Sequence, residues 1–286
     1  MVKRDVVNAV FDRLAEKLPP IFRAYRSGCT PLNTRAKPDG TSVTDADLHI
    51  ETEILGEIRS VDPQGAVLSE ELPASRSWRL PKRCWIVDPI DGTRQFASEE
   101  GREFCSVVAY LDRGRMSVVT VLCPELGIGQ TPIQATYYTD SSILVVNGER
   151  VQPAPLVRMG PTRPASTTRS LGRARSRIEE MAAARGVKRK IRTTSQSLDQ
   201  LRLVLDLSRF SDIDLPMFSF FYREEQKLWD GVVGLALADG LALLATDQSR
   251  ADLLPVDAHS FPGWPPVIPS VLIGPSDLWR WLGDRL

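Results

Sequence analysis

Apolar and polar positions recur along the chain with two different periods, and these periods predict an order of helices and strands. Residues 2–18, "VKRDVVNAVFDRLAEKL", carry apolar side chains at a spacing of three and four, which predicts an amphipathic helix. A second helix is expected over about 46–59, with Thr44 as its N-cap. The apolar runs at 65–71 and 83–88 predict two strands, separated by a polar loop.

The pattern from 104 to 152 predicts a sheet meander. Residues 104–122 are two β-rich runs joined by Asp-Arg-Gly, which is a strong hairpin signal, and 125–138 and 142–152 continue in the same manner. The composition then changes, because prolines, small residues and arginines gather at about 153–168. This stretch is the predicted linker between two parts of the chain.

Beyond the linker, helices and strands are expected to alternate. Residues 176–187 and 197–207 have helical spacing, and short strands are predicted through 210–221. The apolar stretch 229–240 is predicted to be a helix that leads into a strand at 241–247.

Composition and charge exclude several classes of protein. Among 286 residues, Lys+Arg and Asp+Glu both total 36, so nothing in the overall charge favours a nucleic acid polymer or a membrane surface as partner. The most apolar window, 232–245, is broken by Asp239 and is too short to span a bilayer. The four cysteines form no CxxC pair and are expected to be reduced and buried, which suits the cytosol. We therefore expect a soluble cytoplasmic protein.

The chain has little material for histidine chemistry. It contains only two histidines, and it has no G-x-S-x-G elbow, no P-loop and no G-x-G-x-x-G fingerprint. The basic segment 158–192 carries eleven Lys and Arg residues without interleaved aromatic residues. We interpret it as a solvated helix face and linker, and an anion- or nucleic-acid-binding patch is the alternative. Any chemistry must be carried by carboxylates.

The stretch "VDPIDGT" places two aspartates at the end of an apolar strand. Pro89 forces Asp88 into an extended backbone, and the turn returns Asp91 toward it. Gly92 permits a close backbone approach, and the amides of Gly92 and Thr93 at a helix start would form an anion site. Two carboxylates beside an anion site require cations between them. Hard oxygen ligands of this kind select magnesium.

Further acids occur at comparable places. Glu70 and Glu71 also end an apolar strand, and Asp230 follows a tryptophan at a predicted helix start. An aspartate at a helix start is commonly only a cap. Three such acidic sites in one chain, each at the end of a strand or the start of a helix, favour a metal cluster.

Together these segments resemble a known family. The stretches "SEEL", "WIVDPIDGTRQF" and "LWDGVVG", in this order, resemble the three-part signature of the lithium-sensitive, magnesium-dependent phosphomonoesterases of the inositol monophosphatase superfamily. "TSVTDAD" is similar to a fourth segment of that family, so the resemblance covers about 37–240. It implies an α/β (α+β) fold, a layered α-β-α-β-α sandwich. It also implies a sheet domain at 1–155 that holds most metal ligands, and an α/β domain at 156–286.

The resemblance also implies the roles of individual residues. Two or three Mg²⁺ ions, lithium inhibition and a homodimer are implied for the whole protein. The implied metal ligands are Glu70, Asp88, the carbonyl of Ile90, Asp91 and Asp230. The implied catalytic residues, which would position or deprotonate the attacking water, are Asp47 and Thr93, assisted by Glu70. The implied residues for a small phosphorylated substrate are Gly92, Thr93, Lys37 and Arg223.

Local features resemble the 3′(2′),5′-bisphosphate nucleotidase branch more than the inositol branch. Arg94 stands where nucleotidases carry lysine, and Arg223 lies seven residues before Asp230, near an arginine of that branch. Asp199, in contrast, occupies the place of a nucleotidase lysine. We predict a nucleotidase that converts 3′-phosphoadenosine 5′-phosphate to AMP. An inositol or sugar monophosphatase, and a family member that binds nucleotide or anion without turnover, are the alternatives.

Overall fold

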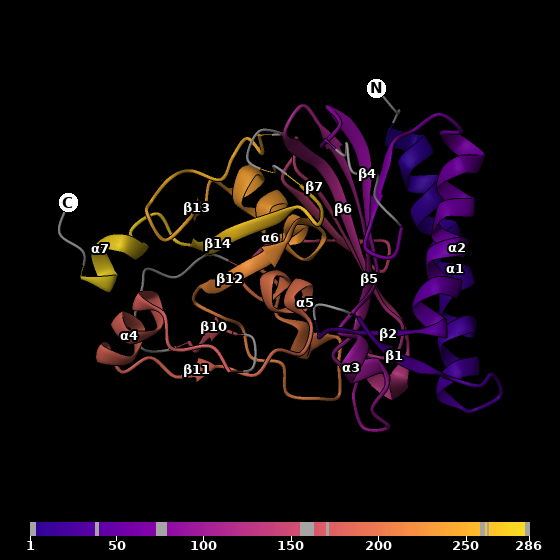
Figure 1. Ribbon diagram of the computed structural model, residues 1–286, viewed down its shortest axis with the longest axis horizontal. Coiled ribbons are helices and arrows are strands. Elements are labelled where there is room, and N and C mark those ends of the chain that lie inside the picture. Colours follow the sequence, from indigo (N-terminus) through magenta and orange to yellow (C-terminus); the bar gives the residue numbers. More distant parts are fainter. Residues whose placement is uncertain are drawn as a thin grey trace.

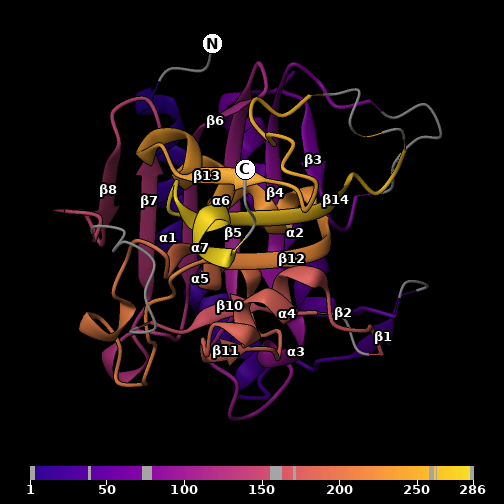
Figure 2. The ribbon, with the colours of Figure 1, turned by 90° about the vertical axis from the view of Figure 1, so that its left-hand side faces the viewer.

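The computed structural model describes residues 4–37, 40–72, 79–154, 163–169, 172–257, 261 and 263–283. These residues form five layers, in which two sheets alternate with three layers of helices (Figure 1). The implied α-β-α-β-α sandwich is therefore confirmed. The strands of the two sheets run roughly crosswise to one another (Figure 2).

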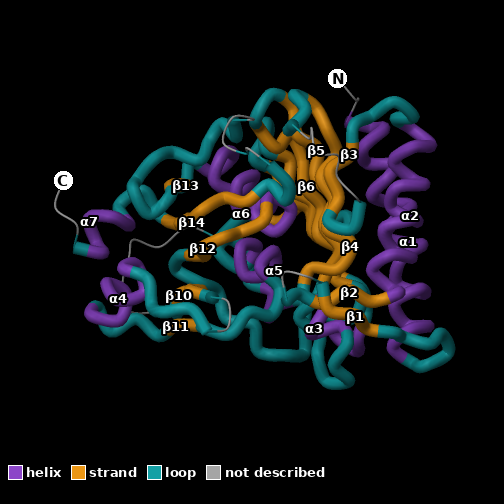
Figure 3. Tube along the Cα trace, in the orientation of Figure 1, coloured by secondary structure: helices purple, strands orange, loops and turns teal. Residues whose placement is uncertain are grey.

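The first layer is a pair of helices, α1 (Arg4–Arg26) and α2 (Asp45–Val61), which cover one face of the larger sheet (Figure 3). Both helices were predicted, and α1 extends further than its amphipathic pattern suggested. Thr44 caps α2: its hydroxyl accepts from the backbone N–H of Asp47, and the Asp47 carboxylate accepts from the backbone N–H of Thr44.

The larger sheet has seven strands in the order β3-β4-β5-β6-β7-β8-β9. Only the β3–β4 pair is parallel, so the predicted meander is confirmed. The strands are β3 (Val67–Ser69), β4 (Arg83–Asp91), β5 (Cys105–Asp112), β6 (Arg115–Cys123), β7 (Ile133–Tyr138), β8 (Ile143–Val146) and β9 (Glu149–Val151). A small two-stranded sheet, β1 (Thr34–Ala36) with β2 (Ser42–Thr44), precedes α2.

The middle layer consists of α5 (Gln196–Leu201) and α6 (Leu228–Leu241). Because α6 lies between the two sheets, almost all of its side chains are buried, which explains its lack of a polar face. The second sheet has the order β11-β10-β12-β14-β13. Its strands are β10 (Ala165–Thr167), β11 (Arg189–Lys190), β12 (Phe221–Lys227), β13 (Leu244–Thr246) and β14 (Val267–Gly274).

The outer layer contains α4 (Arg177–Ala184) and α7 (Leu278–Leu282), which pack on the second sheet. Short helical turns lie outside these layers: α3 (Thr93–Phe96), η1 (Ile128–Gln130) and η2 (Leu207–Arg209). Within the described ranges, no helix is both long and apolar enough to cross a membrane.

Some sequence-based expectations were wrong in the second half. The helix predicted over 197–207 ends at Leu201, because Leu203 and Val204 bond to carbonyls only three residues back. No strand occurs at 210–220, and the sheet strand is β12, whose charged residues conceal its burial in the sequence. The C-terminal strand β14 was not predicted.

Two smaller expectations also need correction. The predicted linker at 153–168 contains the buried strand β10, and 155–162 lie outside the described residues. All four cysteines are free, and three are buried as expected, but Cys29 is exposed.

The end of α1 holds the segment that follows the acid-bearing strand β4. Arg26 donates to the backbone carbonyls of Phe96 (2.9 Å) and Gly101 (3.0 Å) and to the carboxylate of Glu125 (3.1 Å). Phe22 packs between Phe96 and Phe104, at ring-centroid distances of 5.5 Å and 5.6 Å. These contacts fasten the segment from α3 to β5 against the first helical layer.

Replacement of Phe22 tests this anchor. Phe22 is fully buried, so Phe22→Ala is expected to lower the free energy of unfolding by about 3–5 kcal/mol, measured by urea denaturation. Phe22→Leu fills more of the space and is expected to cost clearly less. Equal, small losses in both variants would contradict a tightly packed anchor.

Candidate metal centre and active site

Two aspartates stand at the end of β4, on either side of a bulge. Asp88 is opposite Val107 and Asp91 is opposite Cys105, so the register of β4 against β5 shifts between them. In a regular strand, residues three apart point to opposite faces of the sheet. The extra residue of the bulge removes this alternation and allows both carboxylates to point to the same side. The hydroxyl of Ser106 fixes the bulge by donating to the carbonyl of Pro89 (2.7 Å).

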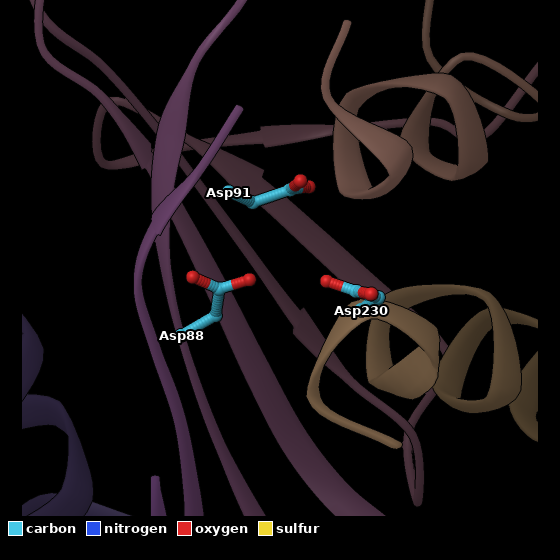
Figure 4. A group of neighbouring side chains, drawn as sticks. All are labelled: Asp88, Asp91 and Asp230. Carbon is cyan, nitrogen blue, oxygen red and sulfur yellow. The ribbon is translucent and has the colours of Figure 1, made fainter. Parts of the chain in front are cut away.

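Asp230 completes a group of three carboxylates. It is the third residue of α6, and the N-cap position is Lys227, whose side chain makes no capping bond. The simpler interpretation of Asp230, as the N-cap of a helix, is therefore wrong. One oxygen of each of Asp88, Asp91 and Asp230 lies within 4.8 Å of the others. Figure 4 shows the three side chains converging from β4 and α6.

The Asp88 carboxylate is buried without a hydrogen bond. It is 1% exposed, and among the described residues neither of its oxygens has a hydrogen-bond partner. Burial, and then the charges of Glu70, Asp91 and Asp230, hold its pKa well above the usual value. Burial likewise raises the pKa of Asp230 to about 8, with Asp91 and Glu70 acting in the same direction.

A buried carboxylate without partners is strongly unfavourable in its charged form unless a cation lies beside it. Three carboxylates that share one small space offer only hard oxygen ligands, the set that divalent magnesium prefers. The residues present therefore fit a divalent metal ion. Asp88, Asp91 and Asp230, which are far apart in the sequence, therefore lie together at a single site.

Asp91 is held by the start of α5. Its carboxylate accepts from the hydroxyl of Ser195 (2.7 Å) and from the backbone N–H groups of Ser197 (2.6 Å) and Gln196 (3.3 Å). Sequence analysis missed these residues. Ser195 also caps α5 by accepting from the N–H of Leu198 (3.1 Å), and a serine before a helix was the available signal.

Asp47 and Thr93, the two residues with implied catalytic roles, lie next to each other. The Thr93 hydroxyl lies 3.3 Å from Asp47 Oδ1 and 3.1 Å from the carbonyl oxygen of Ile90. The other oxygen of Asp47 accepts from the amide (2.7 Å) and hydroxyl (2.6 Å) of Thr44. Burial raises the pKa of Asp47 to about 6, although the bonds from Thr44 oppose this shift.

Glu70 lies beside the three carboxylates but outside their group. Its carboxylate accepts from Lys37 Nζ (2.8 Å), which also donates to Glu71 (2.5 Å). Burial lowers the pKa of Lys37, but the two glutamates outweigh this effect and raise it. Glu51, which sequence analysis did not single out, accepts from the hydroxyl of Ser69 and the amide of Glu71 (3.2 Å) and so fixes this turn.

Gly92 allows the chain to turn directly after Asp91. Its φ of 92° lies in the left-handed region, where a side chain is strained. A Cβ on Gly92 would lie 2.9 Å from the carbonyl oxygen of Glu103, so the expected close backbone approach is made by this neighbouring segment.

Arg223 reaches toward the acids from β12. Its guanidinium is buried and donates to the hydroxyls of Thr193 (2.9 Å) and Thr168 (3.5 Å). Burial lowers its pKa, and the charges of Asp230 and Asp91 act in the opposite direction. The guanidinium therefore lies within electrostatic reach of Asp230 and Asp91.

Residues 4–239 match the model of the inositol monophosphatase family. The chain is 34% identical to the 3′(2′),5′-bisphosphate nucleotidase CysQ of Escherichia coli (strain K12) over 122 residues. This alignment covers 42% of the chain and 45% of the nucleotidase, so less than half of that relative's length is matched.

Two solved structures have a similar fold. The extragenic suppressor protein suhB from Bartonella henselae is 18% identical, with a TM-score of 0.69 over 99% of this chain and 100% of that chain. An IMPase/NADP phosphatase complexed with Mg²⁺ and phosphate is 15% identical, with a TM-score of 0.71 over 97% and 96%. At these identities the likeness concerns the fold.

Removal of one charge from the cluster tests whether it is built for a cation. Asp88→Asn relieves repulsion among buried carboxylates, so in EDTA the variant is expected to melt about 2–4 °C above wild type. This shift corresponds to a gain of about 1 kcal/mol in the free energy of unfolding. Added Mg²⁺ is expected to raise the melting temperature of wild type but not of Asp88→Asn.

Asp112→Asn serves as the control, because Asp112 pairs with Arg83 (2.9 Å) at the other end of β4. This variant should keep the full response to Mg²⁺. A metal response in Asp88→Asn as large as in wild type would contradict the assignment.

Proposed function

The chain belongs to the inositol monophosphatase family, and we propose that it is a magnesium-dependent phosphatase that hydrolyses a small phosphate monoester. The observation that carries this proposal is the buried Asp88 carboxylate, which has no hydrogen-bond partner in the described part of the chain and faces Asp91 and Asp230. A divalent cation removes the cost of this arrangement, and phosphate esters are the anionic substrates that such cations bind.

Five groups are proposed to hold the metal. Glu70, Asp88 and the carbonyl of Ile90 would hold one Mg²⁺, and Asp88, Asp91 and Asp230 a second. Bound Mg²⁺ lowers the pKa of a water and neutralises charge on the attacking and leaving oxygens. In this proposal, Lys37 balances the charge of Glu70 and Glu71 and keeps Glu70 in place.

The residues around the metal site are proposed to orient water and phosphate. Asp47 and Thr93 form a hydrogen-bonded pair in which the Thr93 hydroxyl orients the attacking water and the Asp47 carboxylate accepts its proton. The hydrogen bonds from Thr44 hold Asp47 in one orientation. Glu70 assists Asp47 and Thr93 in positioning or deprotonating the water. The amides of Gly92 and Thr93 at the start of α3 receive phosphate oxygens. No covalent phosphoenzyme is required, because the acids serve as ligands.

The proposed substrate is a 3′(2′),5′-bisphosphate nucleotide, such as 3′-phosphoadenosine 5′-phosphate, which would yield AMP. The similarity to the CysQ nucleotidase supports this choice. Arg223 supports it as well, because a buried guanidinium within reach of the carboxylates is suited to a second phosphate group. An inositol or sugar phosphate is the alternative that the family relationship supports.

Phosphate release tests the proposal. Wild type is expected to release phosphate from 3′-phosphoadenosine 5′-phosphate only with Mg²⁺, and faster than from inositol 1-phosphate or fructose 1,6-bisphosphate. Asp91→Asn should lose the activity with all three esters, since it weakens the carboxylate cluster. Folded wild type that binds Mg²⁺ but hydrolyses none of them would argue for a family member without turnover.

The role of Arg223 is tested by its selectivity. Arg223→Met keeps an apolar stem but removes the donors, so KM for the bisphosphate is expected to rise about tenfold or more. The kcat/KM for inositol 1-phosphate should change far less, because that ester has no second phosphate. Thr193→Val is the control, since it removes a partner of Arg223 and leaves the guanidinium present. Equal losses on both esters would show that Arg223 has a structural role instead.

A further inference from the structure

Three glutamine side chains are buried around the start of α6. Gln196 is 8% exposed, and Gln200 and Gln226 are fully buried. Glutamine is mostly found at protein surfaces, because its amide loses bonds to water when it is buried. Such side chains therefore need specific hydrogen-bond partners, and all three glutamines donate to groups of Asp230.

The three glutamines contact Asp230 in different ways. Gln196 Nε2 donates to the carboxylate oxygen Oδ2 of Asp230 (3.0 Å). Gln226 Nε2 donates to Gln196 Oε1 (3.0 Å) and to the backbone carbonyl of Asp230 (3.2 Å). Gln200 donates to the same carbonyl (2.8 Å) and accepts from the N–H of Gly234 (2.6 Å). Of the three, Gln196 alone donates to the carboxylate.

Gln196 also belongs to the turn that holds Asp91. Its backbone N–H and its side-chain amide donate to two different aspartates, Asp91 at 3.3 Å and Asp230 at 3.0 Å. One residue therefore connects the acid of strand β4 with the acid of helix α6. Any displacement of this turn changes the separation of the two carboxylates.

We propose that Gln196 is a positioning residue that orients the Asp230 carboxylate for metal binding, and that Gln226 holds the Gln196 amide in the required orientation. A hydrogen bond to one oxygen fixes the rotation of the Asp230 carboxylate, one oxygen of which lies within 4.8 Å of an oxygen of Asp88 and of Asp91. A neutral amide suits this task, because an ammonium or guanidinium in its place would compete with the metal for the charge.

This inference rests on the proposed metal site, and its test is the affinity for Mg²⁺ alone, measured by isothermal titration calorimetry on metal-free protein. Gln196→Met keeps the backbone and the approximate volume but removes the donor. Its dissociation constant for Mg²⁺ is expected to rise about tenfold or more. Gln226→Met should cause a smaller rise in the same direction, and it provides the test should Gln196→Met not fold.

Gln200→Met is the matched control, because it removes a buried glutamine that bonds the backbone of Asp230 and Gly234 and does not donate to the Asp230 carboxylate. It is expected to lower the melting temperature while the Mg²⁺ affinity of the folded protein stays unchanged. This separates orientation of the carboxylate from general loss of buried hydrogen bonds.

The outcomes distinguish the inference from the proposed function. Wild-type affinity in folded Gln196→Met and Gln226→Met, together with lost affinity in Asp230→Asn, would falsify the role of Gln196 and leave the metal site intact. If wild type itself binds no Mg²⁺, the metal site fails and the inference fails with it. A drop in affinity in Gln200→Met equal to that in Gln196→Met also overturns it.

Discussion

The site is organised around mutual repulsion between carboxylates that the fold forces into one buried space. Within the ranges that the structure describes, Asp88 has no hydrogen-bond partner, and one oxygen each of Asp91 and Asp230 lies within 4.8 Å of it. The donors that hold Asp91 are a hydroxyl and two backbone amides, and the donor to the Asp230 carboxylate is a side-chain amide. Neutral donors fix the positions of the acids without neutralising them, so the negative charge is preserved for a cation.

The basic side chains near the site lie around the group of three aspartates and not within it. Lys37 pairs with Glu70 and Glu71, and Lys227 lies 3.6 Å from Glu70. Arg223 donates to threonine hydroxyls, and its guanidinium interacts electrostatically with Asp230 and Asp91. This arrangement places positive charge at the edge of the cluster, where a substrate phosphate would also approach. Such a compromise between stability and ligand binding is common where a protein prepares a charged site.

The sequence revealed Asp88, Asp91 and Asp230 because each stands where an apolar run ends or a helix begins, which is a local signal. It did not reveal the start of α5, since backbone amides carry no signature and Ser195 is 104 positions from Asp91. The bulge in β4 was also invisible, although it decides the direction of both acids. Strand β12 was missed for a different reason. Buried Phe221, Tyr222 and Arg223 are followed by the less buried Glu224 and the exposed Glu225, so no regular alternation of polar and apolar positions marks it. The roles of the individual residues remain predictions.

The long separations within the cluster also bear on how the protein is made. Asp91 leaves the ribosome well before Ser195 and Gln196, and Asp230 follows another 34 positions after Gln196. Until α5 and α6 have been synthesised, Asp88 and Asp91 lack both the donors of α5 and the carboxylate of Asp230. The carboxylate cluster closes only when α5 and α6 arrive, and such distant contacts form late because loop closure must come first. Chains that end before α6 lack Asp230 and therefore lack the complete carboxylate cluster, so the proposed metal site exists only once most of the chain has been translated.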